Sequence, residues 1–420
     1  MFKLALRGIS RYKKRTTITA FAVMIAVIFS IFTHTLITGI LLDSEKNLIY
    51  NDTSSAKIYA QNYFEERDYL PIDYLISNKE STQLEKLLLD NGYSNFTKEY
   101  ISSCDIMFYE DPYPTSGSLS VTLKAIDSDN TSAYNFSDSK IDGSWISKDK
   151  DGVVLGAKLA DDIKAKVGYY LTVQTKGKGG FIQAFDIPII GIISTGDPVV
   201  DASTMFFDID IIDYYLELEG SATSYAISYS KNVAKLKDIS KAETKNLNNI
   251  IRFLNLEAYA WDEIAEDILK LQSSKSGFSN IFLFFTFIIA IVGISNTMLM
   301  AISERKNEIA MLKTLGYTNK YIKKLFTLEG TIIGIFGILF GTIMGTIISL
   351  YFQFKGIDIS SFLTKTETIG YRINNVMHSF VSPSQIILIM ILSLFVSIFA
   401  AYFAVRRTGR GEIAEMFRRI

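Results

Sequence analysis

Four long windows without Lys, Arg, Asp or Glu dominate the pattern of apolar and polar positions along this chain. They cover residues 16–42, 276–303, 330–354 and 373–405. In the last window the apolar residues begin near Pro383. Because a helix needs roughly 20 predominantly apolar residues to cross hydrocarbon, each window predicts one transmembrane helix, the fourth at 383–405. This pattern argues against a soluble single-domain enzyme.

The segment between the first two windows, 43–275, is long enough for one or two domains with their own cores. Alternating apolar and polar positions predict strands at 56–60, 118–125, 170–175, 185–193 and 224–230. Helical periodicity appears at 81–89 and 233–254. The two ends, about 43–103 and 219–275, therefore predict strand–helix–strand units packed side by side, with a β-rich subdomain at about 104–218. The expected fold class is a membrane protein with four transmembrane α-helices and a large mixed α/β extracytoplasmic domain inserted between the first and second spans.

Charge is unevenly divided, although the formal net charge is only -1. Basic residues predominate in 1–15, 304–329 and 406–420, whereas 43–275 holds 23 basic and 37 acidic residues. Since Lys and Arg beside the membrane mark its cytoplasmic side, we expect both termini and the 304–329 loop in the cytoplasm. The domain at 43–275 and the loop at 355–382 are then expected outside.

The N-terminal residues predict a further element. Phe2, Ala5, Leu6 and Ile9 share one helical face, so we expect a cytoplasmic amphipathic helix within 1–15. A solvated basic flank is the alternative. The window at 16–42 is about twice as long as the apolar core of a signal peptide, so we expect it to remain as the first span.

Cysteine and histidine usage limits the available chemistry. The only cysteine, Cys104, permits no intrachain disulfide and fits a small core residue. The two histidines, His34 and His378, both lie outside 43–275, which excludes His-rich zinc sites and Ser–His–Asp triads from that domain. We assign no catalytic residue, no metal ligand and no nucleic-acid partner. Two carboxylate pairs stay open for acid–base work, although solvated pairs are more common: Glu65–Glu66 and Asp161–Asp162.

Regularly spaced glycines mark the third window. They recur every three or four residues, so they lie on one helical face and allow another backbone to approach closely. We predict a membrane-helix packing seam at Gly334, Gly337, Gly341 and Gly345.

The loop at 304–329 predicts a rigid helical hairpin. A charged helix is expected to continue from the second span, with Ile309, Leu312 and Leu315 along an apolar edge. Gly316 can end this helix, and Thr318 can cap the helix that leads into the third span. The hairpin presents a charged and apolar tip that suits docking, and simple positive-inside anchoring is the alternative.

The same loop resembles that of the MacB/FtsX-type ABC transporter permeases, where the pattern E-R-x-x-E-I-x-x-L-K-x-L-G precedes the helix that docks on the ATPase. The start of the chain at 4–11 and the stretch GVVLGAKLA at 152–160 are also similar to this family. The resemblance implies a two-part porter region, a β-rich subdomain and a coupling hairpin at 304–329. The residues that match the loop pattern are Glu304, Arg305, Glu308, Ile309, Leu312, Lys313, Leu315 and Gly316.

This resemblance carries implications for partners. The chain has no G-x-x-x-x-G-K-[ST] motif, so ATP and Mg are expected on a separate dimer of cytoplasmic ATPase subunits, and this chain is a non-catalytic permease that binds no cofactor. Its size is most similar to that of the LolC/LolE lipoprotein-releasing permeases. They imply the bacterial inner membrane, a second permease chain (the same or a paralogue), membrane lipid and a lipidated protein cargo. A periplasmic carrier is left open, because the long carrier-binding hairpin of the LolC type is only a short turn at 176–180 here.

The mechanism that follows is mechanical. ATPase closure pushes the hairpin, and the spans carry the motion to the outer domain, which expels a lipid-anchored protein from the outer leaflet. MacB-like efflux of drugs or peptides and FtsX-like transmission to a cell-wall hydrolase are the alternatives, and a receptor or membrane enzyme has little cytoplasmic sequence to support it. Candidate cavity residues between two permease chains, for which packing or lipid contact is equally typical, are Met24, Ile28, Ile31, Phe282, Phe285 and Ile289.

Overall fold

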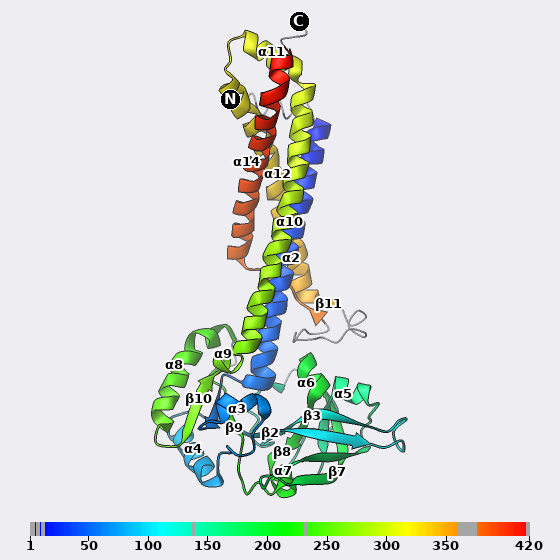
Figure 1. Ribbon diagram of the computed structural model, residues 1–420, viewed down its shortest axis with the longest axis vertical. Helices are drawn as coiled ribbons and strands as arrows, with labels where there is room; N and C mark the ends of the chain where they lie inside the picture. The colour runs from blue at the N-terminus through cyan, green and yellow to red at the C-terminus, as the bar shows by residue number, and fades with distance from the viewer. Residues whose placement is uncertain are drawn as a thin grey trace. The chain divides into compact units, whose positions relative to one another are not determined.

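Four long helices contain the uncharged windows (Figure 1). A computed structural model describes residues 5, 9, 13–136, 139–230, 233–358 and 376–416. Each of the four helices is long and apolar enough to cross a membrane. All four extend beyond the predicted spans: α2 continues past residue 42, α10 begins before residue 276, α12 begins within the predicted hairpin at Asn319, and α14 continues past residue 405. The helices are α2 (Lys13–Leu48), α10 (Glu266–Glu304), α12 (Asn319–Lys355) and α14 (Pro383–Met416).

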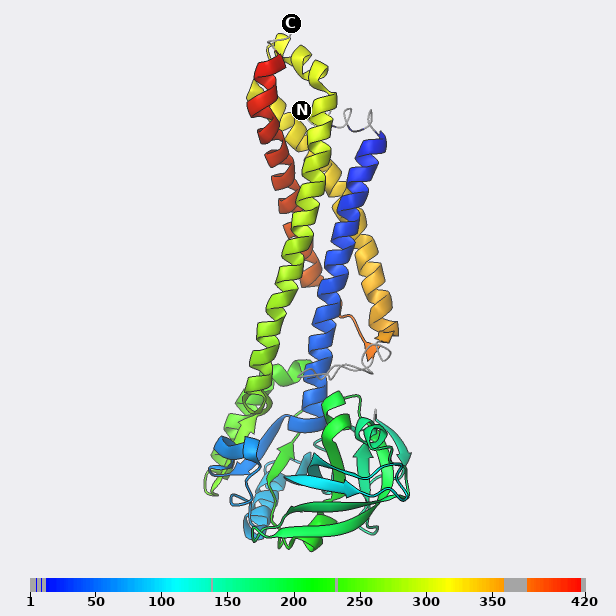
Figure 2. The same ribbon diagram turned by 45° about the vertical axis from the view of Figure 1, so that its right-hand side comes forward.

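The chain divides into two compact units. Of the described residues, the first unit, here called the helical unit, contains those up to 41 with 271–358 and 376–416, and the second, the α/β domain, contains those within 42–270. Within the helical unit, residues from all four long helices share one apolar core, and Figure 2 shows these four helices alongside one another. A short ribbon of β11 (Ile357–Asp358) and β12 (Val376–Met377) joins the ends of the segment after α12.

Two strand–helix–strand units build one end of the α/β domain. The first consists of β1 (Ala56–Ala60), α4 (Asn78–Asp90) and β2 (Phe96–Phe108). The second consists of β9 (Ser224–Ile227), α8 (Val233–Ile251) and β10 (Leu256–Ala260). Both units are predicted from the sequence, but their arrangement side by side is wrong. The strand order is β10-β1-β9-β2 with antiparallel neighbours, so each unit places a strand between the two strands of the other, as in ferredoxin-like folds.

The strands between these units close into a barrel. In order they are β3 (Gly117–Ile126), β4 (Lys140–Gly143), β5 (Val153–Gly156), β6 (Tyr170–Lys176), β7 (Ile182–Ser194) and β8 (Thr204–Asp208). The pairing runs β2-β3-β8-β5-β7-β6 and returns to β2, which closes the ring, while β4 pairs with β7. Because β2 also pairs with β9, one strand belongs to both the barrel and the ferredoxin-like sheet.

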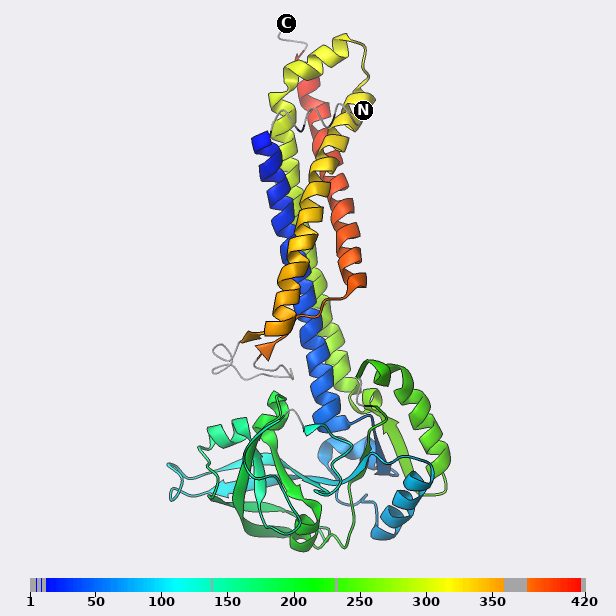
Figure 3. The same ribbon diagram turned by 180° about the vertical axis from the view of Figure 1, so that it is seen from behind.

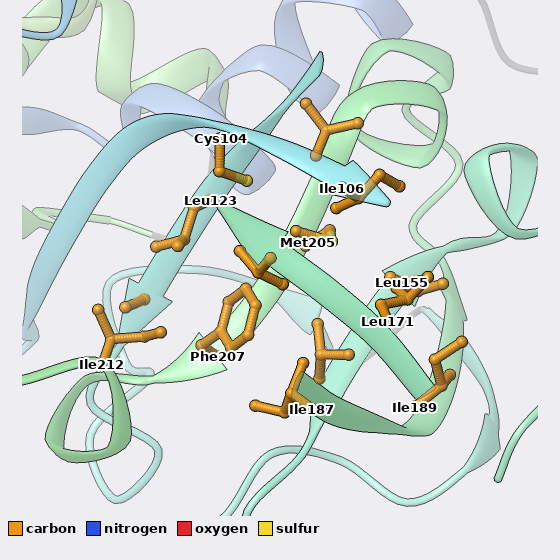
Figure 4. Packing of buried hydrophobic residues seen from close by; sticks show 14 of the residues in the cluster. Cys104, Ile106, Leu123, Leu155, Leu171, Ile187, Ile189, Met205, Phe207 and Ile212 are labelled. Atoms are coloured by element: carbon orange, nitrogen blue, oxygen red, sulfur yellow. The ribbon is translucent and has the colours of Figure 1, made fainter. Parts of the chain in front are cut away.

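Apolar side chains fill the barrel, and Figure 4 shows them pointing toward one another from its strands. Cys104, Ile106 and Leu123 are among them, so the only cysteine is a core residue, as predicted. Short helices line the barrel at α5 (Ala157–Asp162), α6 (Pro198–Ser203) and α7 (Ile209–Leu216). The remaining helical segments of the domain are η1 (Ile49–Thr53), α3 (Tyr63–Glu66), η2 (Arg67–Tyr69) and α9 (Trp261–Ile264).

Candidate functional site

The predicted hairpin is formed by α11 (Lys306–Thr314) and the first turns of α12, visible in Figure 3. Gly316 follows α11 with a φ of 88°, the left-handed conformation in which glycine commonly ends a helix. The Thr318 hydroxyl then accepts a hydrogen bond from the Tyr321 amide at 3.3 Å and caps α12. Both local signals are confirmed. The expected continuation of the charged helix from α10 is wrong, because α10 ends at Glu304 and Arg305 forms a turn that caps α11.

At the turn between α10 and α11, the Arg305 guanidinium holds two carboxylates. Its Nε lies 2.7 Å from Glu308 Oε2, and its Nη1 lies 3.0 and 2.8 Å from the two oxygens of Glu329. The guanidinium also lies 5.2 Å from the centre of the Phe326 ring, a cation–π contact. We call Arg305, Glu308 and Glu329 the hairpin centre. Since the Glu329 side chain is only 4% exposed, its charge requires this arginine.

The apolar edge predicted for the hairpin divides between its inside and its outside. Ile309 is buried and Leu312 half-buried, and both pack against Ile302, Ile322 and Phe326. They hold α11 on α12, which leaves them little surface for a partner. Leu312 also contacts a second cluster that contains the N-terminal residues Ala5 and Ile9, the described part of the predicted amphipathic helix. Phe2 and Leu6 lie outside the described residues.

The exposed apolar surface of the hairpin lies at its turn. Leu315 is 69% exposed, Met311 65% and Tyr317 39%. We call these three residues the tip surface. Gly316 and Glu304 are also exposed, whereas Lys313 is half-buried. Of the eight residues that matched the loop pattern, then, Leu315, Gly316 and Glu304 are the ones the fold presents outward most fully.

The glycine face of α12 packs against two neighbouring helices. Gly337, Gly341 and Gly345 face α2, where an added Cβ at Gly337 would lie 2.7 Å from the Val23 Cβ. Gly334 faces Ser397 of α14. Small residues at these four positions therefore let α12 approach two helices at once within one chain.

The six predicted cavity residues occupy different environments. On α2, Ile31 is fully buried, and Met24 and Ile28 lie half-buried beside Gly341 and Gly345. On α10, Phe285 and Ile289 are exposed. The Phe282 side chain lies outside the described residues. The predicted cavity is one between two permease chains, so it stays a prediction.

A second charged centre lies inside the α/β domain. Glu99 of β2 is completely buried, with one carboxylate oxygen 2.6 Å from Lys57 Nζ and the other 3.9 Å from Lys124 Nζ. Ser224 donates a hydrogen bond to Glu99 at 2.6 Å, and the Tyr134 hydroxyl donates another. We call Glu99, Lys57 and Lys124 the domain centre. Burial favours the neutral acid, but the two lysines prevail and hold the pKa of Glu99 below its ordinary value.

The domain centre is attached to the segment that follows α2. Lys124 Nζ donates a hydrogen bond of 2.9 Å to the backbone carbonyl of Asn51 in η1, and the Tyr134 hydroxyl lies 3.3 Å from the carbonyl of Asp52. The η1 segment is thus fixed to the interior of the α/β domain. Because its members are enclosed, this centre suits a structural role and not catalysis.

The two carboxylate pairs that the sequence leaves open for acid–base work lie apart on the surface of the α/β domain. Glu65 and Glu66 are exposed, and Lys158 pairs with Asp162 at 2.5 Å and lies near Asp161. These are ordinary solvated carboxylates. Within the described part of the chain, no three His, Cys, Asp or Glu side chains gather as they must to hold a metal ion.

Sequence reasoning missed Glu329 and Glu99. Glu329 carries a signal in retrospect, because it is an acid at the border of an uncharged window of 25 residues, where an ionised group needs a partner. Glu99 carries none, since its lysine partners lie 42 and 25 residues away along the chain.

Residues 280–413, which include the hairpin centre and the tip surface, match the model of the FtsX-like permease C-terminal family. This segment is an FtsX-like permease domain. The curated relatives that the chain resembles are ABC transporter permeases, and its four apolar helices indicate a multi-pass membrane protein. This family implies an ATPase partner and a permease dimer.

Two curated relatives and one solved structure illustrate the similarity. An uncharacterised ABC transporter permease of Methanocaldococcus jannaschii is 22% identical over 83% of this chain and 81% of its own length. The lipoprotein-releasing system transmembrane protein LolC of Neisseria meningitidis serogroup B is 24% identical over 63% of this chain, which spans 64% of that relative. The crystal structure of the periplasmic region of MacB from Actinobacillus actinomycetemcomitans is 17% identical with a TM-score of 0.34, over 51% of this chain and 92% of its own.

Proposed function

We propose that this chain transmits ATP hydrolysis by a separate cytoplasmic ATPase to its α/β domain, and that the motion extracts lipoproteins from the outer leaflet of the bacterial inner membrane. In this proposal the basic termini and the hairpin lie in the cytoplasm, because Lys and Arg beside the spans mark that side. The acidic α/β domain lies outside. Two permease chains, two ATPase subunits and a lipidated cargo complete the machine.

The hairpin carries this proposal. Its core residues lock α11 onto α12, and the hairpin centre fixes the start of α11 to a buried acid of α12. A push on the tip surface is therefore passed to α12 as a rigid body and not lost in bending. Met311, Leu315 and Tyr317 form an exposed apolar patch of the kind that marks protein contact sites.

Coupling is tested by ATPase stimulation. The full chain is purified with the ATPase that accompanies it from its own cells and is reconstituted in lipid. Leu315→Ser and Glu304→Lys are each expected to lower stimulation at least tenfold, because they alter exposed groups of the hairpin. Phe253→Ser, at an even more exposed apolar residue of the α/β domain, is the matched control. Stimulation that persists in both hairpin variants, with normal assembly, rules out the docking role.

Glu308→Lys is a less selective test of docking. Glu308 accepts a hydrogen bond from Arg305, so its reversal disturbs the hairpin centre as well as the surface. A loss of stimulation in Glu308→Lys alone, with Glu304→Lys active, therefore points to the fold of the hairpin and not to direct contact with the ATPase.

The cargo is tested separately with proteoliposomes that contain the complete transporter and a lipidated protein. ATP is expected to release that protein, whereas the same protein on a transmembrane anchor stays in the membrane. Release that does not depend on ATP argues against lipoproteins as the cargo. Retention of both proteins in the membrane when ATP is added does the same.

The short connection between β6 and β7 favours a second candidate, MacB-like efflux or FtsX-like mechanotransmission. These strands are joined by the turn at 177–181, where the Gly177 amide donates a hydrogen bond to the Phe181 carbonyl and the Gly177 carbonyl accepts one from the Gly180 amide. A carrier-binding hairpin of the LolC type has no room in this turn. ATP-driven movement of a drug, a peptide or a hydrolase domain in the same proteoliposomes supports this candidate.

A further inference from the structure

A groove runs between α2 and α12 near the basic end of the first helix. It has a volume of about 310 Å³. The rings of Phe21, Phe336 and Phe340 in its lining are exposed. The other lining residues are Thr16, Thr17, Ala20 and Met24 of α2 and Ile333 and Gly337 of α12. The two helices are in close contact at Gly337, where an added Cβ would lie 2.7 Å from the Ala20 carbonyl oxygen, and the groove lies beside this contact.

The groove changes character along α2. Lys13, Thr17, Ala20 and Met24 recur at helical spacing and form one stripe, so the charged, hydroxyl and apolar positions follow one another on a single face. Lys13 and the adjacent Lys14 are exposed at its basic end. In α12 the acid closest to the groove in sequence, Glu329, is buried and held by Arg305. No described carboxylate of the groove lining opposes the two lysines.

The dimensions favour a thin occupant. The eight helical steps from Thr16 to Met24 span about 12 Å, which gives the groove a mean cross-section of roughly 26 Å². A helix with side chains is about 10–12 Å wide and does not fit this width. An extended hydrocarbon chain does.

We propose that this groove binds one acyl chain of an anionic phospholipid, whose phosphate lies beside Lys13 and Lys14. Apolar walls accept the chain, the threonine hydroxyls lie at the level of the glycerol region, and the lysines supply the charge that selects the headgroup. Basic residues beside membrane helices, at the level of the membrane surface, favour anionic headgroups over neutral ones. The proposal requires that the four helices span a membrane. It does not depend on the identity of the cargo or on the ATPase.

The experiment is native mass spectrometry of the full chain in detergent, titrated with phosphatidylglycerol or phosphatidylcholine of identical acyl chains. The unaltered chain is expected to retain phosphatidylglycerol about tenfold more strongly. The double variant Lys13→Gln/Lys14→Gln is expected to retain the two lipids equally. Thr17→Phe and Ala20→Phe are expected to lose the tightly held lipid of either kind, because each places a ring in the groove.

Two matched controls are expected to behave as the unaltered chain. Lys355→Gln removes a lysine at the opposite end of α12, and Ile391→Phe adds a ring at an exposed apolar position of α14. Thr17 is exposed, so Thr17→Phe keeps the test valid where Ala20→Phe fails to fold.

Three outcomes overturn the proposal. The first is equal retention of the two lipids by the unaltered chain, and the second is unchanged retention in both groove variants. The third is a change in oligomeric mass in Thr17→Phe without a change in bound lipid, which assigns the groove to a second copy of this chain. Lipid retention is measured without ATPase, so its failure is distinguishable from a failure of the coupling role.

Discussion

The domain centre and the hairpin centre both pair carboxylates with cationic side chains, but in opposite numbers. In the α/β domain one carboxylate, Glu99, is shared by two lysines, and the side chains of all three are at most 5% exposed. In the helical unit one arginine is shared by two carboxylates, and Glu308 is 32% exposed. One centre is therefore enclosed on every side, whereas the other has a partner that water can replace.

This difference shows how burial decides what an ion pair does. A buried charge that loses its partner costs several kcal/mol, so the domain centre holds β1, β2, β3 and η1 in one arrangement. In the hairpin centre only the Arg305–Glu329 contact is enclosed to that degree. Exchange of the Glu308 contact for water costs little, because exposed pairs contribute at most about 1 kcal/mol. Loss of the Glu308 contact alone therefore leaves Arg305 paired with Glu329.

Removal of the shared carboxylate has the largest expected effect. Glu99→Gln leaves Lys57 and Lys124 charged and without their acid, so we expect the α/β domain to lose about 3–5 kcal/mol of unfolding free energy. Both tryptophans of the chain, Trp145 and Trp261, lie in this domain, so their fluorescence reports its unfolding in the full detergent-solubilised chain. Glu257→Gln, at an exposed acid of β10, is the control and is expected to change stability by less than about 0.5 kcal/mol. Similar transitions in both variants contradict a stabilising role for Glu99.

Removal of the shared cation is expected to act locally. Arg305→Gln leaves Glu329 buried without its charge partner and should raise hydrogen exchange in α11 and the first turns of α12 by roughly 30-fold, equivalent to about 2 kcal/mol. Arg305→Lys is expected to recover only part of this loss, since lysine cannot hold two carboxylates with a fixed fork. The tryptophan transition should stay unchanged in both variants. Unchanged exchange in Arg305→Gln, or exchange that rises equally in Lys324→Gln, shows that the hairpin does not depend on its centre.

Lowering the pH is expected to reduce the stability of the α/β domain by a smaller amount, in a direction set by the pKa of Glu99. Although burial alone raises the pKa of Glu99, the two lysines lower it below the ordinary value. The folded domain then binds this proton less readily than the unfolded chain, so the ionised form of Glu99 stabilises the fold above the unfolded pKa of about 4.3. That contribution is lost as pH falls through the lower, folded pKa.

The tryptophan midpoint in denaturant measures this loss at a series of pH values. We expect the contribution of Glu99 to be constant between neutral pH and about pH 5 and to fall below about pH 4. Glu99→Gln should remove that part of the acid dependence. If the variant retains the full acid dependence, other carboxylates account for it.

Local signals are what the sequence predicts well. Uncharged windows of 25 or more residues predict the four long helices, and Gly316 and Thr318 mark the hairpin turn because both act within a few residues. Alternation predicts β3 and β6, each of which has one face more exposed than the other over part of its length. The strands β5 and β8 lack alternation because they are buried on both faces, and they are not predicted.

Contacts between distant residues account for the remainder. The interleaved strands of the ferredoxin-like sheet, the closure of the barrel and both charged centres join positions that are far apart in sequence. Glu99 looks like any acid of a polar strand until β1 and β3 bring Lys57 and Lys124 to it. The docking residues show the same limit, since the loop pattern places Ile309 and Leu315 together, whereas the fold buries the first and exposes the second.

The labelling rate of the cysteine is expected to show the smallest effect. It also separates the two centres most clearly, because only one of them holds the strand that carries Cys104. Cys104 lies on β2, five residues beyond Glu99, and burial in the barrel raises the pKa of its thiol to about 12. Because the thiolate is the reactive form, maleimide at pH 8 is expected to label the native chain only through opening of β2. Glu99→Gln should accelerate labelling, because the domain centre holds this strand, and Arg305→Gln should leave the rate unchanged. Rapid labelling of the unaltered chain, or equal acceleration by both variants, contradicts the assignment of the two centres to separately stabilised parts of the molecule.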